Sequence, residues 1–400
     1  MRLVSSMIAL VLLAGCDSQD SSFDGGGLHD ANANDAAALD AGENGDAGGD
    51  ALRARVEPAV APLVDASGED ATRAVALVVV VVTAEQSSVF GFGALRAGGD
   101  AVPDGRTVFP VGSISKIYTG LMLAAAIESS GGVLAPETPV NALLAADLRA
   151  PSYMGIDITV EHLVTHYGAL PTLPSNVTGP MTSPARDYSR AQLATFLSGH
   201  ALDHAPGTTY EYSNLGSGLL GVALADHAGD AGYDALLRRA LVEPLGMVDT
   251  GTNEPDFRAR VGHRTVQPYR VVGDALEEVA ISDMGVLAGG GEVLTTGDDL
   301  ARFVRVLTGL DGFGVAGAVE RTITPVAAGA GSTEVAYAID VTTRPDGVRV
   351  YEKTGGTAGS TSFMSFLREP AVGVAILSSR GTHRAIRAVT RQLLRSIEEG

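Results

Sequence analysis

The sequence predicts an α+β fold in which one antiparallel sheet is built from N- and C-terminal segments and flanked by helices. Strand-like runs occur early in the chain, at 75–82 and 89–95, and again late, at 348–353, 362–367 and 372–378. The segments between these two groups read mainly as helices. Strands at both ends around a mainly helical insertion indicate a single sheet assembled from distant parts of the chain.

The N-terminal elements read as a helix followed by a hairpin. An amphipathic pattern covers about 52–64, and the run 75–82 consists largely of valine, which favours a strand. Only a short polar turn separates this run from 89–95, so the two strands are expected to pair as a β-hairpin.

The middle of the chain reads as helices joined by loops. Six segments carry the helical pattern: 115–129, 159–165, 190–198, 215–228, 233–240 and 298–307. Thr295 or Thr296 is a possible cap of the last. Four prolines between Gly168 and Ser189 predict a long loop of the kind that often forms the rim of a site. A closing helix is expected at 382–398.

The first 16 residues have the pattern of a targeting segment. Arg2 precedes a short apolar run, which ends in the sequence Leu13-Ala14-Gly15-Cys16 and is too short to span a bilayer. This ending resembles the bacterial lipoprotein signal, in which the chain is cut before the cysteine and the thiol receives lipid. We therefore expect lipidation of Cys16 and a lipid-anchored protein of the bacterial cell envelope that faces the periplasm or the cell exterior.

Composition divides the rest of the chain into a tether and a globular domain. Residues 17–50 are rich in Asp, Gly, Ala, Asn and Ser, and they predict a disordered acidic tether. The domain is expected at 51–400. Its α/β part is expected at about 51–135 and 290–400, and its helical part at about 136–289.

Charge and cysteine content exclude several classes of function. The formal net charge is −19, and nine acidic residues with no Lys or Arg lie within 17–50. Because no Lys/Arg cluster is present to neutralise phosphates, a nucleic-acid partner is not expected. The single cysteine, Cys16, allows neither an intrachain disulfide nor a cysteine-based metal cluster. Nothing indicates a cofactor or oligomerisation, so a monomer is expected.

The chain contains only two lysines, and each lies in a motif that can carry chemistry. Lys116 follows Ser113 by three residues at the start of an apolar helix, which places both side chains on one face. A desolvated lysine can activate a serine hydroxyl, because burial lowers its pKa. Lys353-Thr354-Gly355-Gly356 follows a predicted strand and leaves room for a substrate against the backbone. Each motif alone is also compatible with a helix cap or a strand end, but the chance of both lysines falling in such motifs is on the order of one in a thousand.

Tyr212-Ser213-Asn214 is the third candidate motif. A phenol near a cation can titrate below its usual pKa, and an Asn amide can bind both lysine and substrate. Taken alone, this motif is also compatible with a packed tyrosine followed by a helix cap.

Together the three motifs resemble the serine β-lactamase and penicillin-binding superfamily, in the branch of class C β-lactamases, D-alanyl-D-alanine carboxypeptidases and esterases. The tyrosine of the middle motif indicates this branch, and the similarity spans about 55–395. Further similar segments are Val108–Ser113, Pro206-Gly207, Glu243–Met247 and Ala288-Gly289-Gly290 leading to Asp299–Phe303. The segment His166–Pro171 matches the branch's usual motif only in part. The resemblance implies a β-lactamase/transpeptidase-like fold.

The resemblance also implies roles for individual residues. Ser113 would be the acylated nucleophile, with Lys116 as base or proton relay and Tyr212 as the general base that returns a proton to the leaving group. Which of Lys116 and Tyr212 accepts the first proton is left open. Asn214 would orient Lys116 and the substrate, and Lys353 would depress the pKa of Tyr212.

Further roles concern the binding of the substrate. The N–H groups of Ser113 and Gly356 would form the oxyanion hole. Thr354, Gly355 and Arg380 are candidates for substrate binding, the last for a carboxylate.

Two histidine pairs have the spacing of zinc ligands on a helix. They are His162 with His166 and His200 with His204. Neither pair has the glutamate of a His-Glu-x-x-His motif, and no third ligand is evident, so structural or surface roles and no metal are expected.

The leading functional hypothesis is a serine hydrolase that acts through an acyl-enzyme on Ser113. Its substrate would be a β-lactam, a D-Ala–D-Ala peptide of peptidoglycan or a small ester. An intact Lys-Thr-Gly motif is compatible with carboxylate-bearing substrates and favours the first two. The alternative is a non-catalytic envelope-binding lipoprotein that retains the fold.

Overall fold

The computed structural model describes residues 47–400. The predicted signal segment, Cys16 and residues 17–46 of the predicted tether lie outside the described residues. Helix α1 (Ala47–Val60) begins earlier than the sequence pattern indicated, and its first turn takes in residues 47–50. Asp50 lies in that turn, where the helix dipole favours a negative charge. None of the helices in 47–400 has the length and apolar character needed to cross a membrane.

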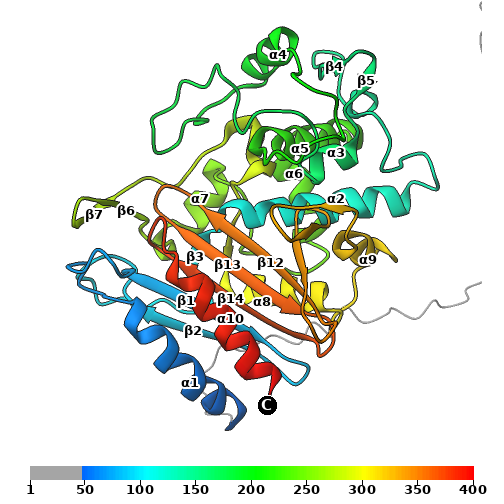
Figure 1. The fold of residues 1–400 in the computed structure, drawn as a ribbon. Helices are drawn as coiled ribbons and strands as arrows, with labels where there is room; N and C mark the ends of the chain where they lie inside the picture. Colours follow the sequence, from blue (N-terminus) through cyan, green and yellow to red (C-terminus); the bar gives the residue numbers. More distant parts are fainter. Residues whose placement is uncertain (1–46) are drawn as a thin grey trace, which may run out of the picture. The chain divides into compact units, whose positions relative to one another are not determined.

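One eight-stranded antiparallel sheet forms the centre of the fold (Figure 1). In spatial order its strands are β2 (Ser87–Gly93), β1 (Ala76–Val82), β14 (Val372–Ser378), β13 (Thr361–Leu367), β12 (Arg349–Gly356), β11 (Asp340–Thr343), β10 (Glu334–Val335) and β9 (Ala327–Ala328). The first strand of the chain pairs with the last, Val79 lying opposite Ile376, so the sheet is assembled from both ends as predicted. The sequence did not reveal β9–β11, because strands of two to four residues carry too little alternation to be recognised.

Both faces of the sheet are covered, which explains the continuous apolar run of β1. Leu77, Val79 and Val81 belong to the cluster that α1 and α10 (Ala385–Glu398) cover. These two helices contact each other over that face (Figure 1). Val78 and Val80 belong to the larger cluster on the opposite face, and all seven residues of β1 are buried. Full burial of a valine side chain contributes roughly 1.5–3 kcal/mol, so β1 is a main anchor of the sheet.

Helices α2 (Ser115–Ser129) and α8 (Gly297–Thr308) pack within the larger cluster, where Tyr118 of α2 stacks on Phe303 of α8 at 4.0 Å between ring centroids. Beyond α2 lies the helical part of the chain (Figure 1). The remaining helices are α3 (Val160–Val164), α4 (Arg190–Gly199), α5 (Asn214–Ala228), α6 (Tyr233–Leu237), which continues into a π-helical turn at Arg238–Val242, α7 (Pro255–Val261) and α9 (Ala318–Ile323). All six helices predicted for the middle of the chain are present, with ends shifted by a few residues.

Short two-stranded pairs complete the structure. They are β3 (Val108–Pro110) with β8 (Leu294–Thr296), β4 (Ser152–Tyr153) with β5 (Ile156–Asp157), and β6 (Tyr269–Val272) with β7 (Ala275–Glu278). The first pair leads the chain directly to Ser113.

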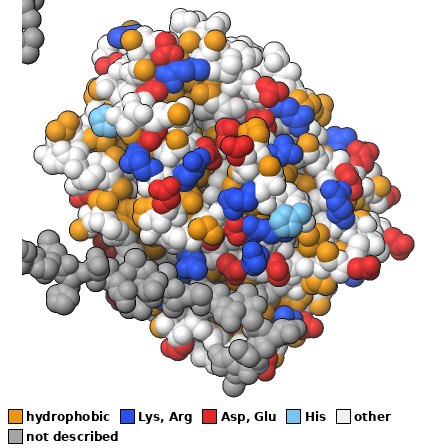
Figure 2. All heavy atoms as spheres, turned by 180° about the vertical axis from the view of Figure 1, so that it is seen from behind, with side chains coloured by type: hydrophobic (Ala, Val, Ile, Leu, Met, Phe, Trp, Pro, Cys, Tyr) orange, Lys and Arg blue, Asp and Glu red, His pale blue; other side chains and the backbone are white. Residues whose placement is uncertain are grey.

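On the face shown in Figure 2, Arg and acidic side chains are interspersed.

Candidate active site

Ser113 lies in a short 3₁₀ turn that runs directly into α2. The turn covers Gly112–Ile114 and follows β3. The fully buried Ser115 fixes this turn, because its Oγ donates to the Gly112 carbonyl at 2.6 Å and accepts the N–H of Val293 at 2.9 Å. Ser115 is thus a structural serine, whereas the side chain of Ser113 remains partly accessible.

Two glycines allow β12 to pass against this turn. Gly112 has φ = +53°, and a Cβ there would lie 2.5 Å from the nitrogen of Gly356. A Cβ on Gly355 would lie 2.0 Å from the Val111 carbonyl oxygen. Strand β12 therefore extends beyond the predicted strand 348–353 and continues through Gly356. This close approach brings the Gly356 N–H beside the peptide that joins Gly112 to Ser113, as an oxyanion hole requires.

Lys116 is completely buried one turn after Ser113. Its Nζ lies 3.0 Å from Ser113 Oγ and donates hydrogen bonds to Asn214 Oδ1 at 2.7 Å and to the carbonyl oxygen of Gly290. A neutral amine has two N–H groups and one lone pair. The two acceptors occupy both N–H groups, so the lone pair is left for the hydroxyl proton of Ser113.

The electrostatic surroundings favour the neutral amine. Burial holds the pKa of Lys116 well below its ordinary value, and the positive charge of Lys353 lowers it further. A neutral amine within hydrogen-bond distance of a serine hydroxyl is a competent general base. The arrangement therefore favours Lys116 over Tyr212 as the first proton acceptor, a choice that the sequence left open.

Tyr212 donates a hydrogen bond from its hydroxyl to Ser113 Oγ. Both lysines lie near its ring, with Lys116 Nζ 4.8 Å and Lys353 Nζ 5.7 Å from the ring centroid. Lys353 was expected to depress the pKa of Tyr212, but in this structure desolvation of the hydroxyl dominates and the pKa is raised. Tyr212 is therefore a neutral phenol that can donate a proton.

The motif residues after Tyr212 have separate tasks. Asn214 is the first residue of α5 and its amide oxygen accepts from Lys116. Ser213 caps the same helix: its Oγ accepts the N–H of Gly216 at 2.8 Å and donates to the Pro171 carbonyl at 2.7 Å. Tyr212 and Asn214 thus lie on either side of the cap residue Ser213. Tyr212 contacts Ser113, and Asn214 contacts Lys116.

Lys353 lies in β12 and is 3% exposed. Burial lowers its pKa, while the carboxylate of Asp340 raises it in part. Thr354, the next residue, is exposed on the other side of the strand. Gly355 allows the close approach of β12 to Val111, and its role in substrate binding stays a prediction.

His166 and Gly290 are site residues that sequence reasoning missed. His166 is 1% exposed, and its ring centroid lies 4.5 Å from that of Tyr212. Its Nδ1 accepts the Ser213 N–H, and burial together with both lysines keeps its pKa well below the usual value, so the ring is neutral. Gly290 supplies the carbonyl that binds Lys116, and a Cβ at Gly290 would lie 2.5 Å from the Asn214 carbonyl oxygen. Both residues lie in segments that resemble the family, which was the available signal.

A cleft of about 280 Å³ opens over Ser113. The predicted loop between Gly168 and Ser189 forms part of its rim, together with the residues around Met284 and the end of β12. The lining residues are Ser113, Leu173, Met181, Thr182, Ser183, Pro184, Ala185, Asn214, Ser282, Asp283, Met284, Gly290, Gly291, Gly356, Thr357 and Ala358. The nucleophile therefore faces a space that can hold a small substrate.

Arg380 does not line this cleft. Its guanidinium donates to the carbonyl oxygens of Ala71 at 2.7 Å and Thr382 at 3.2 Å, so the expectation that it binds a substrate carboxylate is wrong. A second cavity of about 440 Å³ shares Gly356 and Thr357 with the cleft and is lined by two other arginines, Arg384 and Arg387.

These two arginines are the charged groups of the second cavity. Its other lining residues are Thr354, Gly355, Gly356, Thr357, Thr361, Phe363, Thr382, His383 and Ile386. Burial and the charge of Arg380 lower the pKa of His383 to about 4, so its ring is neutral at pH 7. This positive surface beside Gly356 is the second feature that sequence reasoning missed.

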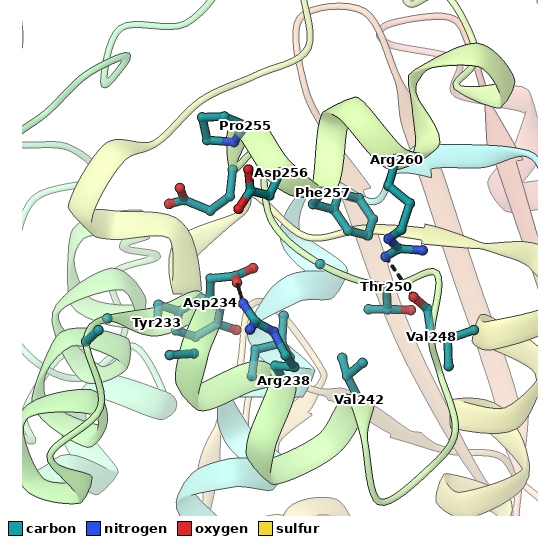
Figure 3. Close-up of a pocket in the computed structure, with 16 residues that line it drawn as sticks. Tyr233, Asp234, Arg238, Val242, Val248, Thr250, Pro255, Asp256, Phe257 and Arg260 are labelled. Atoms are coloured by element: carbon teal, nitrogen blue, oxygen red, sulfur yellow. Dashed lines mark hydrogen bonds and ion pairs between the residues drawn. The ribbon is translucent and has the colours of Figure 1, made fainter.

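A larger cavity, of about 720 Å³, lies among α6, the π-helical turn and α7 (Figure 3). Asp234 and Arg238 bind each other there, and Arg260 donates to the Val248 carbonyl. No serine, cysteine or lysine lines this cavity, so it offers no counterpart of the Ser113 and Lys116 pair.

The histidine pairs do not form a metal site in the described structure. His162 caps α3, since its Nδ1 accepts the Thr159 N–H, while His166 packs against Tyr212. Within residues 47–400 no group of three or more His, Cys, Asp or Glu side chains could hold a metal ion.

Comparisons with known proteins find relatives along most of the chain. The family model described as Beta-lactamase matches residues 52–398. The D-alanyl-D-alanine-carboxypeptidase/endopeptidase AmpH of Escherichia coli (strain K12) is 27% identical over 325 residues, which cover 77% of this chain and 80% of that protein. Penicillin-binding protein 4 of Amycolatopsis lactamdurans is 26% identical over 312 residues, covering 72% of this chain and 76% of the relative.

Solved structures share the fold at lower identity. A class C beta-lactamase superposes with a TM-score of 0.73 at 20% identity, covering 89% of this chain and 99% of its own. A Beta-lactamase/D-alanine Carboxypeptidase from Yersinia pestis gives a TM-score of 0.69 at 20% identity, with 86% and 97% covered. The match of the family model to most of the chain, together with the fold, shows that this chain belongs to the beta-lactamase family.

Proposed function

We propose that this protein is a serine hydrolase that cleaves carboxylate-bearing amides, either a D-Ala–D-Ala peptide or a β-lactam, through an acyl-enzyme on Ser113. The observation that carries the proposal is the position of Ser113 Oγ, which lies 3.0 Å from the buried amine of Lys116 and accepts the hydroxyl of Tyr212. A protein that only binds a ligand has no need of a desolvated amine beside a serine, so a non-catalytic role has no support.

Acylation would proceed with Lys116 as the base. The neutral amine removes the hydroxyl proton of Ser113 as Oγ attacks the substrate carbonyl, and the N–H groups of Ser113 and Gly356 stabilise the oxyanion. The carbonyl-to-nitrogen bond then breaks, and the leaving nitrogen takes a proton from the neutral phenol of Tyr212. Tyr212 regains a proton from the ammonium of Lys116, so the proton removed from Ser113 is balanced by the one that leaves with the amine.

The positive cavity next to the cleft supports a substrate with a carboxylate. Arg384 and Arg387 are exposed, and no acidic side chain lines the cavity with them. A guanidinium binds a carboxylate by paired hydrogen bonds, and these contacts would fix the leaving group of a substrate whose scissile carbonyl lies at Ser113. Simple esters lack that carboxylate and would bind less well.

The test is a parallel measurement of kcat/KM on nitrocefin, on a peptide ending in D-Ala–D-Ala and on p-nitrophenyl acetate. We expect turnover of at least one of the first two, with a higher kcat/KM than for the ester. Measurable turnover of p-nitrophenyl acetate alone would refute the assignment of carboxylate-bearing amides. The Ser113→Ala variant serves as the control for hydrolysis that does not depend on the site.

We also propose that the protein is anchored in the cell envelope through lipid on Cys16. The proposal rests on Leu13-Ala14-Gly15-Cys16 at the end of an apolar run. Metabolic labelling with a fatty acid should label the wild-type protein and leave the Cys16→Ser variant unlabelled. Equal labelling of the two proteins would refute the anchor.

A further inference from the structure

One acidic residue lines the cleft that contains the nucleophile. Among the residues that line the cleft, Asp283 is the only one with a charged side chain. The catalytic scheme above gives it no task, because Ser113, Lys116 and Tyr212 account for every proton that moves.

Asp283 is held in a fixed position. Its N–H donates to Ser183 Oγ at 3.0 Å, and the same hydroxyl donates to the Asp283 carbonyl at 2.9 Å. Ser183 is 4% exposed, so this link between the long loop and the 282–284 segment is sheltered from water. One carboxylate oxygen, Oδ1, accepts the N–H of Gly285 at 2.7 Å, which fixes the direction of the side chain.

The negative charge of Asp283 is not neutralised within the described chain. Across residues 47–400, no Lys, Arg or His lies within ion-pair distance of its carboxylate. The neighbouring Glu292 is acidic and its pKa is raised in part by Asp283. A carboxylate without a counter-ion, at the surface of a substrate cleft, is a binding group for a cation.

The charges of the cleft and the adjoining cavity are therefore of opposite sign. Asp283 belongs to the cleft that contains Ser113, and Arg384 and Arg387 belong to the cavity beyond Gly356 and Thr357. If the arginines bind the carboxylate of the leaving group, the acyl part of the substrate is left in the cleft that Asp283 lines.

We propose that Asp283 selects substrates whose acyl part carries an ammonium group. This inference rests on the proposed function and adds a substrate class to it: amides with a free amine on the acyl side and a carboxylate on the leaving side. Asp283 acts on binding and leaves the chemistry at Ser113 unchanged.

Three penicillins provide matched probes. Ampicillin carries an amine on its acyl side chain, benzylpenicillin carries hydrogen at that position, and carbenicillin carries a carboxylate. The second-order rate constant of acylation of Ser113 is measured for each with the wild-type protein and with Asp283→Asn. The Asn side chain keeps the oxygen that accepts from Gly285 and removes the charge, so folding is preserved.

We expect the ratio of the ampicillin to the benzylpenicillin rate to fall about five-fold in Asp283→Asn, the size expected of one partly exposed ion pair. The ratio of carbenicillin to benzylpenicillin should rise by a similar factor. Asp274→Asn, which removes an exposed carboxylate from the turn between β6 and β7, should leave both ratios unchanged. In 1 M salt the effect of Asp283→Asn should shrink, since salt screens an exposed pair.

Peptides test the same point with a different leaving group. Nα-acetyl-L-Lys-D-Ala-D-Ala has a free amine that Nα,Nε-diacetyl-L-Lys-D-Ala-D-Ala lacks, and only the wild-type protein should prefer the first. Unchanged penicillin ratios in Asp283→Asn would overturn the inference and leave the proposed function standing. Failure of all three penicillins and both peptides to react at Ser113 would overturn both.

Discussion

Replacing Gly112 by alanine should separate acylation from folding. In the structure Gly112 has φ = +53°, and a Cβ would lie 2.5 Å from the Gly356 nitrogen and 2.8 Å from the Gly356 carbonyl oxygen. An ordinary Cβ contact begins at 3.4 Å, so Gly356 or the turn must move by about 0.9 Å to relieve the contact with nitrogen. That nitrogen is a proposed donor of the oxyanion hole.

The size of the effect follows from two separate costs. An alanine in the left-handed region costs roughly 1–2 kcal/mol of folding free energy. Loss of one oxyanion donor lowers the rate of acyl transfer by about 100- to 1000-fold. Gly112→Ala should therefore lose modest stability and at least about 100-fold in acylation rate.

Gly131→Ala is the matched control. Gly131 has φ = +62°, and a Cβ added there would meet no atom within 4 Å, so alanine at this position carries the same backbone strain without a clash. The assay is the acylation rate by a fluorescent penicillin, with thermal unfolding of each variant measured alongside. The reasoning is refuted if Gly112→Ala acylates as fast as Gly131→Ala.

Three further predictions concern the base, the arginines and a buried acid. Lys116→Arg should lower acylation at pH 7 by at least about 100-fold, because a guanidinium keeps its proton and cannot act as a base; a near-normal rate in the folded variant would exclude Lys116 as the base. Arg384→Ala and Arg387→Ala should each raise KM for a carboxylate-bearing peptide about five-fold and leave p-nitrophenyl acetate unaffected, while Arg395→Ala, farther along α10, should change neither. Burial raises the pKa of Glu292 to about 8 from an ordinary value of 4.5, so the folded state holds this proton more tightly than the unfolded state. The contribution of protonated Glu292 to the free energy of unfolding is therefore fully present below about pH 4.5. It is lost as the pH rises to about 8, and the loss is at most about 4–5 kcal/mol. The free energy of unfolding, measured in urea between pH 5 and 8, should fall less steeply with pH in Glu292→Gln than in the wild-type protein. Equal slopes in the two proteins would contradict the assignment.

The fold could be predicted because its signals are local and strong. The valine run of β1, the late strands and the helix at 115–129 each carry a clear pattern, and pairing of the two ends follows from the need to bury them. The strands β9–β11 are too short for such a pattern. The end of β12 was misplaced because two glycines suggest a turn, whereas in the structure they permit close contact with Val111.

The site was predictable to the extent that chemistry-bearing residues are rare in this chain. With only two lysines, Lys116 and Lys353 stood out, and the structure places both against Tyr212. The direction of the Tyr212 pKa was not predictable, since it depends on burial of the hydroxyl. The choice of Arg380 failed for a related reason: sequence shows that an arginine follows β14, but only the path of the chain shows that its guanidinium binds Ala71.

Covalent reaction at Ser113 is the central step of the proposed mechanism. The decisive measurement is intact-protein and peptide mass spectrometry after incubation with a penicillin and, separately, with a fluorophosphonate. We predict one adduct per chain, located on Ser113, and none on the Ser113→Ala variant or on the neighbouring buried Ser115. A folded wild-type protein that acquires no adduct, or that acquires it at another residue, would contradict the account.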